Sequence, residues 1–311
     1  MTNYLPEGFL INTKENIKSL SSYDAFYKAF TDKKQLEARA IYCDREHNLH
    51  IDFGFIHGII PREECAIGIK EGTTRDIAII ARVNKPVRFI IDDIRLSGDK
   101  KIAFLSRRKV QEDFQNQINK TIFTGDIIIA RITHLETFGA FCDIGCGINA
   151  LLPIDNISVS RIPHPNVRFN VGDDIKVIIK SFDENGRATL THKELLGSWE
   201  ENAEKFHIGE TVSGIVRSVE NYGIFVELTP NLAGLAEYTP SVFDGQQTSV
   251  YIKSIIPEKM KVKLIIVDSF DADYPKKKPD YFIKEGHLDY FRYSPYLSEK
   301  IIETFFWFYL K

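Results

Sequence analysis

The sequence has few cysteines and no long hydrophobic run. Its four cysteines are irregularly spaced and form no CxxC pair, so we expect neither a disulfide framework nor a metal site: Cys43, Cys65, Cys142 and Cys146. The longest apolar stretch, residues 301–310, contains Glu303 and is too short to span a bilayer. The N-terminus lacks the basic start and apolar core of a secretory signal. These absences predict a soluble cytoplasmic protein without a membrane partner.

Motifs of common enzymes are also lacking. The sequence contains no GxxxxGK[ST], HExxH or GxGxxG. Its paired carboxylates, Asp92 with Asp93 and Asp173 with Asp174, are adjacent in sequence and point to opposite faces of a strand, so they form no catalytic dyad. We therefore expect no catalytic residue, no cofactor and no small-molecule substrate.

The formal net charge is -3, which gives no overall basic excess for binding nucleic acid. Residues 1–123 hold 20 basic and 17 acidic residues, residues 124–206 hold 8 and 12, and residues 207–311 hold 12 and 14. If the protein binds RNA, aromatic stacking must supply much of the affinity, with only local basic contacts to phosphate.

An internal repeat dominates the chain. Residues 125–153, GDIIIARITHLETFGAFCDIGCGINALLP, are similar to residues 209–237, GETVSGIVRSVENYGIFVELTPNLAGLAE, at a constant offset of 84, and residues 37–61 form a weaker copy. Each copy is rich in β-branched and aromatic residues in short alternating runs bounded by Gly, Asp and Asn. Modules of this size and pattern predict a mainly β protein with three tandem five-stranded OB-type barrels.

Helical spacing of apolar residues predicts short α-helical linkers between the barrels. The domain boundaries that we expect are an N-terminal helical segment at 1–35, a degenerate first barrel at 36–108, a linker helix at 109–123, a second barrel at 124–192, a linker helix at 193–206, a third barrel at 207–269 and a tail at 270–311. We expect the tail to be helical and to bury its aromatic end, residues 305–309, on the third barrel; a protein-protein interface is the alternative.

Strand alternation predicts an aromatic pair on the outside of two barrels. In the second barrel it places Ala140, Cys142 and Ile144 inside and Phe141 and Asp143 outside, with Phe138 on the outer side. In the third barrel it places Ile224, Val226 and Leu228 inside, with Tyr222, Phe225 and Glu227 outside. Outward rings suit RNA bases, whereas a lone ring more often caps a barrel end.

The FGAF motif, the Gly-rich turn and the hairpin VGDDIKVIIKSFDENGRATLTHKE resemble the S-one RNA-binding domain, named after the bacterial small-subunit ribosomal protein S-one. The resemblance covers about two thirds of the chain domain by domain. It implies single-stranded RNA or mRNA binding in translation, by residues Phe138, Phe141, Asp183 and Arg187 of the second barrel and Tyr222, Phe225 and Lys261 of the third. The sequence departs from the family where Pro153 and Glu237 replace a histidine and Pro257 replaces the aspartate. Arg131 and His134 on the first strand of the second barrel are further candidates.

The three copies differ in how well they match this pattern. We expect the second barrel to be the main RNA site and the third to be weaker. In the third, Glu237 and Pro257 replace polar partners, and Glu227 would repel phosphate beside Phe225. The first copy has only His47 and His50 as weak candidates, and its HGIIPREE segment resembles the domains that dock S-one proteins to the 30S subunit. A protein-interaction scaffold, or an RNA-binding regulator at the ribosome or the RNA decay machinery, remains the alternative, and the oligomeric state is open.

Overall fold

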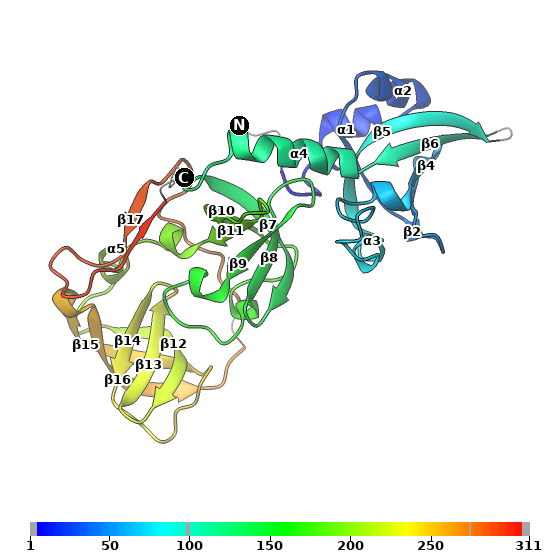
Figure 1. Cartoon of the computed structure of the whole chain (residues 1–311). Helices are drawn as coiled ribbons and strands as arrows, with labels where there is room; N and C mark the ends of the chain where they lie inside the picture. The colour runs from blue at the N-terminus through cyan, green and yellow to red at the C-terminus, as the bar shows by residue number, and fades with distance from the viewer. Residues whose placement is uncertain (1–4, 98–99, 274, 307–311) are drawn as a thin grey trace. The chain divides into compact units, whose positions relative to one another are not determined.

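The computed structural model describes residues 5–97, 100–273 and 275–306 and is mainly β (Figure 1). It divides into two compact units. The first unit comprises Met1–Phe123 and Asp143–Asn149, and the second comprises Thr124–Cys142 and Ala150–Lys311. Among the described residues, no helix is long and apolar enough to cross a membrane.

Four helices belong to the first unit: α1 Lys14–Ser19, α2 Tyr23–Thr31, α3 Ile77–Ile80 and α4 Arg108–Thr121. The hydroxyl of Ser22 caps α2 by accepting a bond from the backbone N–H of Ala25. The buried ring of Phe26 on this helix packs into the core of the first sheet. Helix α4 follows that sheet, where a linker helix is expected.

The first sheet is open, which corrects our expectation of a closed five-stranded barrel. Its strands pair in the order β1-β5-β6-β4-β3-β2, with bounds β1 Leu36–Arg39, β2 Tyr42–Cys43, β3 Leu49–Asp52, β4 His57–Ile60, β5 Pro86–Ser97 and β6 Lys100–Ser106. The two edge strands are consecutive in the chain. Between them the N–H of Ala40 donates to Lys85 O and that of Ile41 donates to His50 O. β1 and β2 therefore correspond to one first strand that is interrupted between them, with β1 paired to β5 and β2 paired to β3. If this strand were continuous, the sheet would close into a barrel.

The first unit contains a buried ion pair between Glu7 and Arg107. The Glu7 carboxylate is buried and accepts bonds of 2.6 and 2.9 Å from the Arg107 guanidinium. Burial opposes ionisation of Glu7, but the charges of Arg107 and Arg82 outweigh it and hold the Glu7 pKa below its usual range. Asp143, expected on an outer surface, is 2% exposed because it accepts bonds from the N–H groups of Glu7, Gly145 and Gly147. Burial and then the charge of Glu7 raise the pKa of Asp143 to about 6.

The second unit contains two closed five-stranded barrels. The second barrel pairs in the order β10-β11-β9-β8-β7 and the third in the order β12-β13-β14-β16-β15. The bounds are β7 Ile127–Glu136, β8 Gly139–Asp143, β9 Asn149–Pro153, β10 Asp174–Phe182 and β11 Ala188–Thr191, then β12 Thr211–Glu220, β13 Gly223–Thr229, β14 Leu232–Ala236, β15 Gln247–Ile256 and β16 Lys261–Phe270. Helix α5, Trp199–Ala203, lies between the barrels in sequence.

The expected interior is confirmed where the strands alternate. Ala140, Cys142, Ile224 and Val226 are fully buried, whereas Phe141 and Phe225 between them are only half-buried. A glycine precedes each of these runs. A Cβ on Gly139 would lie 2.4 Å from Leu152 O, and a Cβ on Gly223 would lie 2.5 Å from Ala236 O. Only glycine allows the second strand to approach the third this closely.

The C-terminal tail is extended, which corrects our expectation of a helix. Its described residues form a hairpin of β17 Tyr290–Arg292 and β18 Glu303–Phe305, and three prolines upstream and within the loop disfavour a helix: Pro275, Pro279 and Pro295. The expected burial of Phe305 is also wrong, because this ring is 55% exposed. Residues 307–311 lie outside the described residues.

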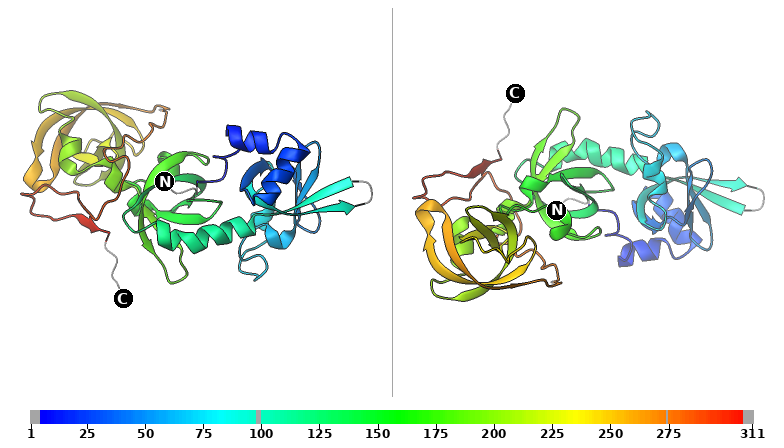
Figure 2. Two further views of the ribbon diagram at one scale, coloured as in Figure 1. Left: turned by 90° about the horizontal axis from the view of Figure 1, so that it is seen from above. Right: turned by 90° about the horizontal axis from the view of Figure 1, so that it is seen from below.

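The tail packs on both barrels of the second unit, not on the third alone (Figure 2). Phe306 is 2% exposed and packs with Ile178 of the second barrel. Tyr293 packs in the core cluster of the third barrel, and its hydroxyl donates to Asn231 O at 2.5 Å. The tail therefore holds the two barrels together at two separate points.

We predict that Phe306→Ala destabilises the full chain by up to about 3 kcal/mol, because it removes a buried ring from the contact with Ile178. Phe305→Ala is the matched control. Its ring is more than half exposed and contacts the ring of Tyr290 at 5.0 Å, so we expect a smaller loss of about 0.5–1.5 kcal/mol. Urea unfolding followed by circular dichroism measures both. Equal effects of the two substitutions would contradict the docking of Phe306.

A second prediction concerns His192, which is buried where the tail meets the second barrel. Its Nδ1 donates to Ile157 O and its Nε2 lies 3.2 Å from the Tyr281 hydroxyl. Burial lowers the pKa of His192 from 6.5 to about 4. Between these two pKa values the unfolded chain therefore binds more protons than the folded chain. The contribution of the neutral His192 to the unfolding free energy is fully present above pH 6.5 and is lost as the pH falls toward 4.

The expected loss from His192 over this range is about 3 kcal/mol, at 1.36 kcal/mol for each pKa unit. His192→Gln should flatten the dependence of the unfolding free energy on pH. Urea titrations at pH 7 and pH 4.5 test this. A slope retained in His192→Gln would contradict a neutral buried histidine.

Candidate nucleic-acid interface

Two aromatic rings meet on the outside of the second barrel. Phe138 precedes β8 and is 54% exposed, and Phe141 on β8 is half-buried. Their ring centroids are 6.1 Å apart at an interplanar angle of 88°. This edge-to-face contact fixes both rings and leaves a face open to solvent at Phe138.

The third barrel repeats this arrangement. Tyr222 is 70% exposed, and its ring lies 6.1 Å from that of Phe225 at 85°. In the strand pairing, Phe225 is opposite Ser218 of β12. The offset of 84 makes His134 the counterpart of Ser218.

The hairpin residues Asp183 and Arg187 are exposed in the turn between β10 and β11. One carboxylate oxygen of Asp183 accepts bonds from the N–H groups of Asn185 and Arg187, at 2.9 and 2.8 Å. Asp183 thus shapes the turn. Among the described residues, the Arg187 guanidinium has no hydrogen-bond or ion-pair partner, so its charge is available to a ligand.

Arg131 and His134 are already engaged by carboxylates. Arg131 forms two bonds with Asp174, of 2.6 and 2.8 Å, and His134 Nε2 lies 2.7 Å from a carboxylate oxygen of Glu136. Both side chains must exchange a partner before they contact phosphate. The second barrel therefore presents two rings and Arg187 as its most available groups.

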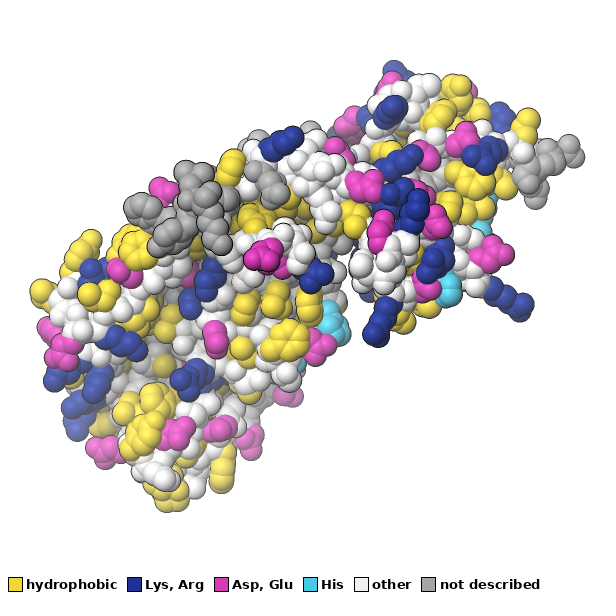
Figure 3. All heavy atoms as spheres, viewed as in Figure 1, with side chains coloured by type: hydrophobic (Ala, Val, Ile, Leu, Met, Phe, Trp, Pro, Cys, Tyr) yellow, Lys and Arg dark blue, Asp and Glu magenta, His cyan; other side chains and the backbone are white. Residues whose placement is uncertain are grey.

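A hollow of about 740 Å³ lies on the third barrel beside its two rings. Its floor includes Leu235 of β14, and Tyr222 and Phe225 line one part of it. Five lysines line it as well: Lys253, Lys259, Lys261, Lys263 and Lys300. We call this hollow the lysine groove. Figure 3 has the same viewpoint as Figure 1. Its dark-blue side chains, which are Lys and Arg, gather over the region where Figure 1 shows β14 to β16.

The lysine groove collects most of the positive charge of its barrel. Residues 207–270 contain five basic residues, and four of them, all but Arg217, line the groove. Only Lys261 was expected here. The others were missed because the parallel pairing of β14 with β16, which sets Leu235 opposite Lys263, is not visible in the sequence. The alternation KVK at 261–263 is the one signal that predicts two lysines on the same face.

Glu227 does not repel phosphate at this face, which corrects our expectation. It is 5% exposed and accepts bonds from Arg168 at 2.5 and 2.7 Å and from Arg217 at 2.8 and 3.0 Å. Burial alone would raise the pKa of Glu227, but the bonds from the two guanidinium groups hold it below its usual range. One of the two reasons for expecting a weak third barrel is therefore removed. The other stands, because Glu237 and Pro257 occupy the positions of polar partners.

In the first sheet the exposed aromatic ring is that of Tyr42, and the histidine expected to meet RNA lies beneath it. His50 is 8% exposed, stacks on Tyr42 at 4.3 Å and lies between His57 and Asp44, at 2.8 and 2.9 Å. The bond from His50 lowers the pKa of Asp44. His47 is in a turn with a φ of 64° and lies 3.8 Å from Asp76. His50 and His47 stay predictions, and the ring of His50 is enclosed by these neighbours.

No group of three or more His, Cys, Asp or Glu side chains in the described part of the chain suits a metal ion. The four cysteines are free thiols, and three of them are buried.

Comparison with protein families identifies the central module. Residues 121–193 match the family described as the S1 RNA binding domain, which is the S-one domain that the sequence resembles. These residues form an S1 RNA-binding domain. The match covers the second barrel with both of its rings. It also includes the hairpin of β10 and β11, with Asp183 and Arg187 in its turn.

Curated relatives match most of the chain. It is 27% identical over 276 residues to the small ribosomal subunit protein bS1 of Staphylococcus aureus strain COL, covering 83% of this chain and 68% of the relative. It is 29% identical over 267 residues to the protein of that name from Rhizobium meliloti strain 1021, covering 84% of this chain and 45% of the relative. The resemblance to the S-one ribosomal family is confirmed by these matches, although the chain spans less than half of the longer relative.

Among solved structures, a multidomain protein with nucleic acid binding domains from Streptococcus pneumoniae matches 77% of this chain and 75% of its own length. The identity is 13% and the TM-score 0.26, a likeness too weak to support an argument.

Proposed function

We propose that the protein binds single-stranded RNA by stacking bases on two barrels. The observation that carries the proposal is the repeated ring pair, with centroids 6.1 Å apart at nearly the same angle in the second and third barrels. Stacking on such rings tolerates any base, because every base has a flat face.

Exposed cations of each barrel bind the phosphates. Arg187 serves the second barrel, with Arg131 and His134 exchanging their carboxylate partners when RNA arrives. Lys261 and its neighbours in the lysine groove serve the third. On this basis the third barrel binds RNA at least as well as the second, and Asp183 acts through the shape of its turn.

The cellular role that we propose is in translation, with mRNA as the natural ligand, in the bacterial cytoplasm and without catalytic activity. The support is the name of the curated relatives, which are proteins of the small ribosomal subunit. For the first unit we propose docking to the 30S subunit instead of base stacking, because His50 is enclosed in its own sheet.

Removing the rings of either pair should weaken RNA binding by about 1–3 kcal/mol for each base that loses its stack. We predict this loss for Phe138→Ala with Phe141→Ala, and for Tyr222→Ala with Phe225→Ala. Phe243→Ala is the matched control, because its ring is 63% exposed on the third barrel and does not line the lysine groove. Fluorescence anisotropy with a labelled RNA oligonucleotide measures the affinities. Unchanged binding in both double variants, with intact circular dichroism spectra, would refute the proposal.

The lysine groove should make binding depend on salt. Each neutralised phosphate of a single strand contributes about -0.7 to the slope of log K against log salt. Lys261→Ala with Lys263→Ala should therefore make the slope shallower by about 1.4, if each lysine meets one phosphate. Lys284→Ala, an exposed tail lysine outside the groove, should leave the slope unchanged. A slope insensitive to the groove lysines would show that phosphates bind elsewhere.

A further inference from the structure

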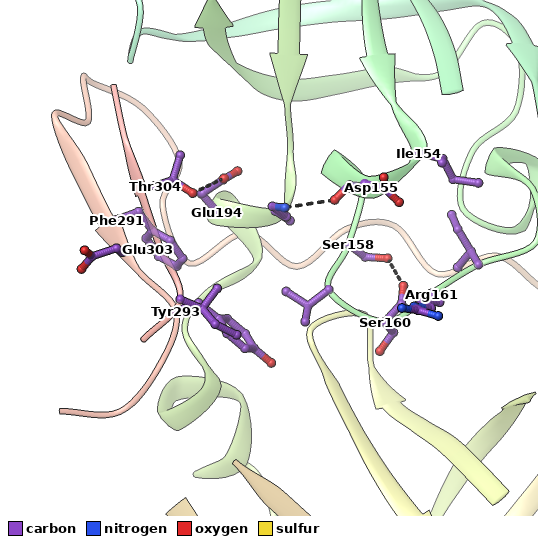
Figure 4. A pocket seen from close by; sticks show the side chains of 14 residues that line it. Ile154, Asp155, Ser158, Ser160, Arg161, Glu194, Phe291, Tyr293, Glu303 and Thr304 are labelled. Atoms are coloured by element: carbon purple, nitrogen blue, oxygen red, sulfur yellow. Dashed lines mark hydrogen bonds between the residues drawn. The ribbon is translucent and has the colours of Figure 1, made fainter. Parts of the chain in front are cut away.

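A second hollow, of about 500 Å³, lies between the second barrel and the tail hairpin (Figure 4). Phe291, Tyr293 and Thr304 of the tail stand on one side in that view, and Ile154 and Arg161 stand on the other. We call it the connecting hollow. Neither ring pair lines it, and no residue expected to bind RNA lies in it.

The connecting hollow is linked to the backbone of Phe138. Its lining residue Ile154 donates its backbone N–H to the carbonyl oxygen of Phe138 at 2.9 Å. The backbone that carries the exposed ring is thus bonded directly to the wall of the hollow.

At its other end the connecting hollow joins the lysine groove. Four residues line both: Val159, Ser160, Tyr293 and Ile302. The two hollows are therefore neighbours around the same side chains. The two hollows and the backbone bond at Phe138 together span from the second barrel, along the tail, to Tyr222 and Phe225.

The tail wall of these two hollows is held in place at three points. The Tyr293 hydroxyl donates to Asn231 O, the Glu299 N–H donates to Glu258 O at 3.2 Å, and the Thr304 hydroxyl donates to Glu194 at 2.9 Å. The second of these bonds joins the tail loop to the turn before β16, next to Lys259. Lys300 thereby becomes part of the lysine groove although it is about 40 residues from the other lysines in sequence.

One cation in the connecting hollow is available to the phosphates of an RNA strand. Arg161 is exposed in the connecting hollow, and its guanidinium has no hydrogen-bond or ion-pair partner among the described residues. Two of the acidic side chains there are bonded: Glu194 is buried and bonded to Thr191 and Thr304, and Glu303 accepts a bond from the Tyr290 hydroxyl. The third, Asp155, is exposed and opposes the strand beside Arg161. Lys193 donates to Asp155 O.

We propose that the second barrel, the tail and the third barrel form one continuous site for a single RNA strand. The strand stacks on Phe138 and Phe141, crosses the connecting hollow past Arg161 and enters the lysine groove to stack on Tyr222 and Phe225. The inference rests on the proposed function of the two ring pairs and adds the connection between them, with the tail as its wall.

The test compares a short and a long RNA on the full chain. An OB fold covers about 4–16 nucleotides, so an oligonucleotide of about 4 occupies one barrel and one of about 12 reaches both. Linked binding raises affinity by about 10²–10⁴-fold. We expect the long RNA to bind at least about 100-fold more tightly, with one long or two short molecules for each chain by isothermal titration calorimetry.

Arg161→Glu separates the connection from the stacking sites. It should weaken the long RNA about tenfold and change the short RNA less than about twofold, because only the long strand crosses the hollow. Lys284→Glu is the matched control, since it makes the same charge change at an exposed tail position outside both hollows and should affect neither RNA.

The outcomes are distinct. Similar affinities for the two RNAs, with no specific effect of Arg161→Glu, would overturn the continuous site while leaving two separate stacking sites. Failure of both RNAs to bind the native chain would overturn the proposed function itself and favour a protein partner at these surfaces.

Discussion

The close approach of the second and third strands of each barrel is the constraint on which the candidate interface depends. At Gly139 and Gly223 the space for a side chain is filled by a carbonyl oxygen of the neighbouring strand, 2.4 or 2.5 Å from where a Cβ would stand. The chain can turn there only with glycine, and the turn carries one ring just before the strand and another two residues into it. The same backbone solution in both barrels therefore produces the same ring geometry.

A second constraint joins the two barrels of the second unit. The buried Glu227 carboxylate accepts bonds from Arg217 of its own barrel and from Arg168, which belongs to the second barrel. A buried carboxylate needs such partners, since removing one leaves an uncompensated charge. Asn231, also fully buried, donates to Lys193 O and Gly197 O and accepts from Val159 N–H. These polar contacts have strict geometry, so they fix how the two ring pairs are placed relative to each other.

The sequence predicts what depends on local pattern. Alternation and the repeat offset identify the inner residues and both ring pairs, because a strand buries every second side chain. It does not predict what covers a residue on the outside of a barrel. Strand alternation therefore predicts that Glu227 and Asp143 are exposed, whereas both are buried in the structure. It also cannot bring together Lys300 and Lys253, which meet only after the third barrel has closed and the tail has docked. The helical expectation for the tail failed because its apolar residues pair as β17 and β18.

The lysine groove shows why net charge is a poor guide to an anionic partner. Residues 207–311 carry more acidic than basic residues, yet interactions between exposed charges are largely screened beyond about 8 Å at physiological salt. A phosphate in the groove is therefore governed by the lysines around it and by Glu237, the one acidic side chain in its lining. Acidic groups elsewhere, such as Asp244 and Asp268, are not among the lining residues. They add little repulsion inside the groove, but they do oppose non-specific binding of nucleic acid to the rest of the surface. On the proposed function, an acidic chain can thus hold a single strand at one place without becoming a general polyanion binder.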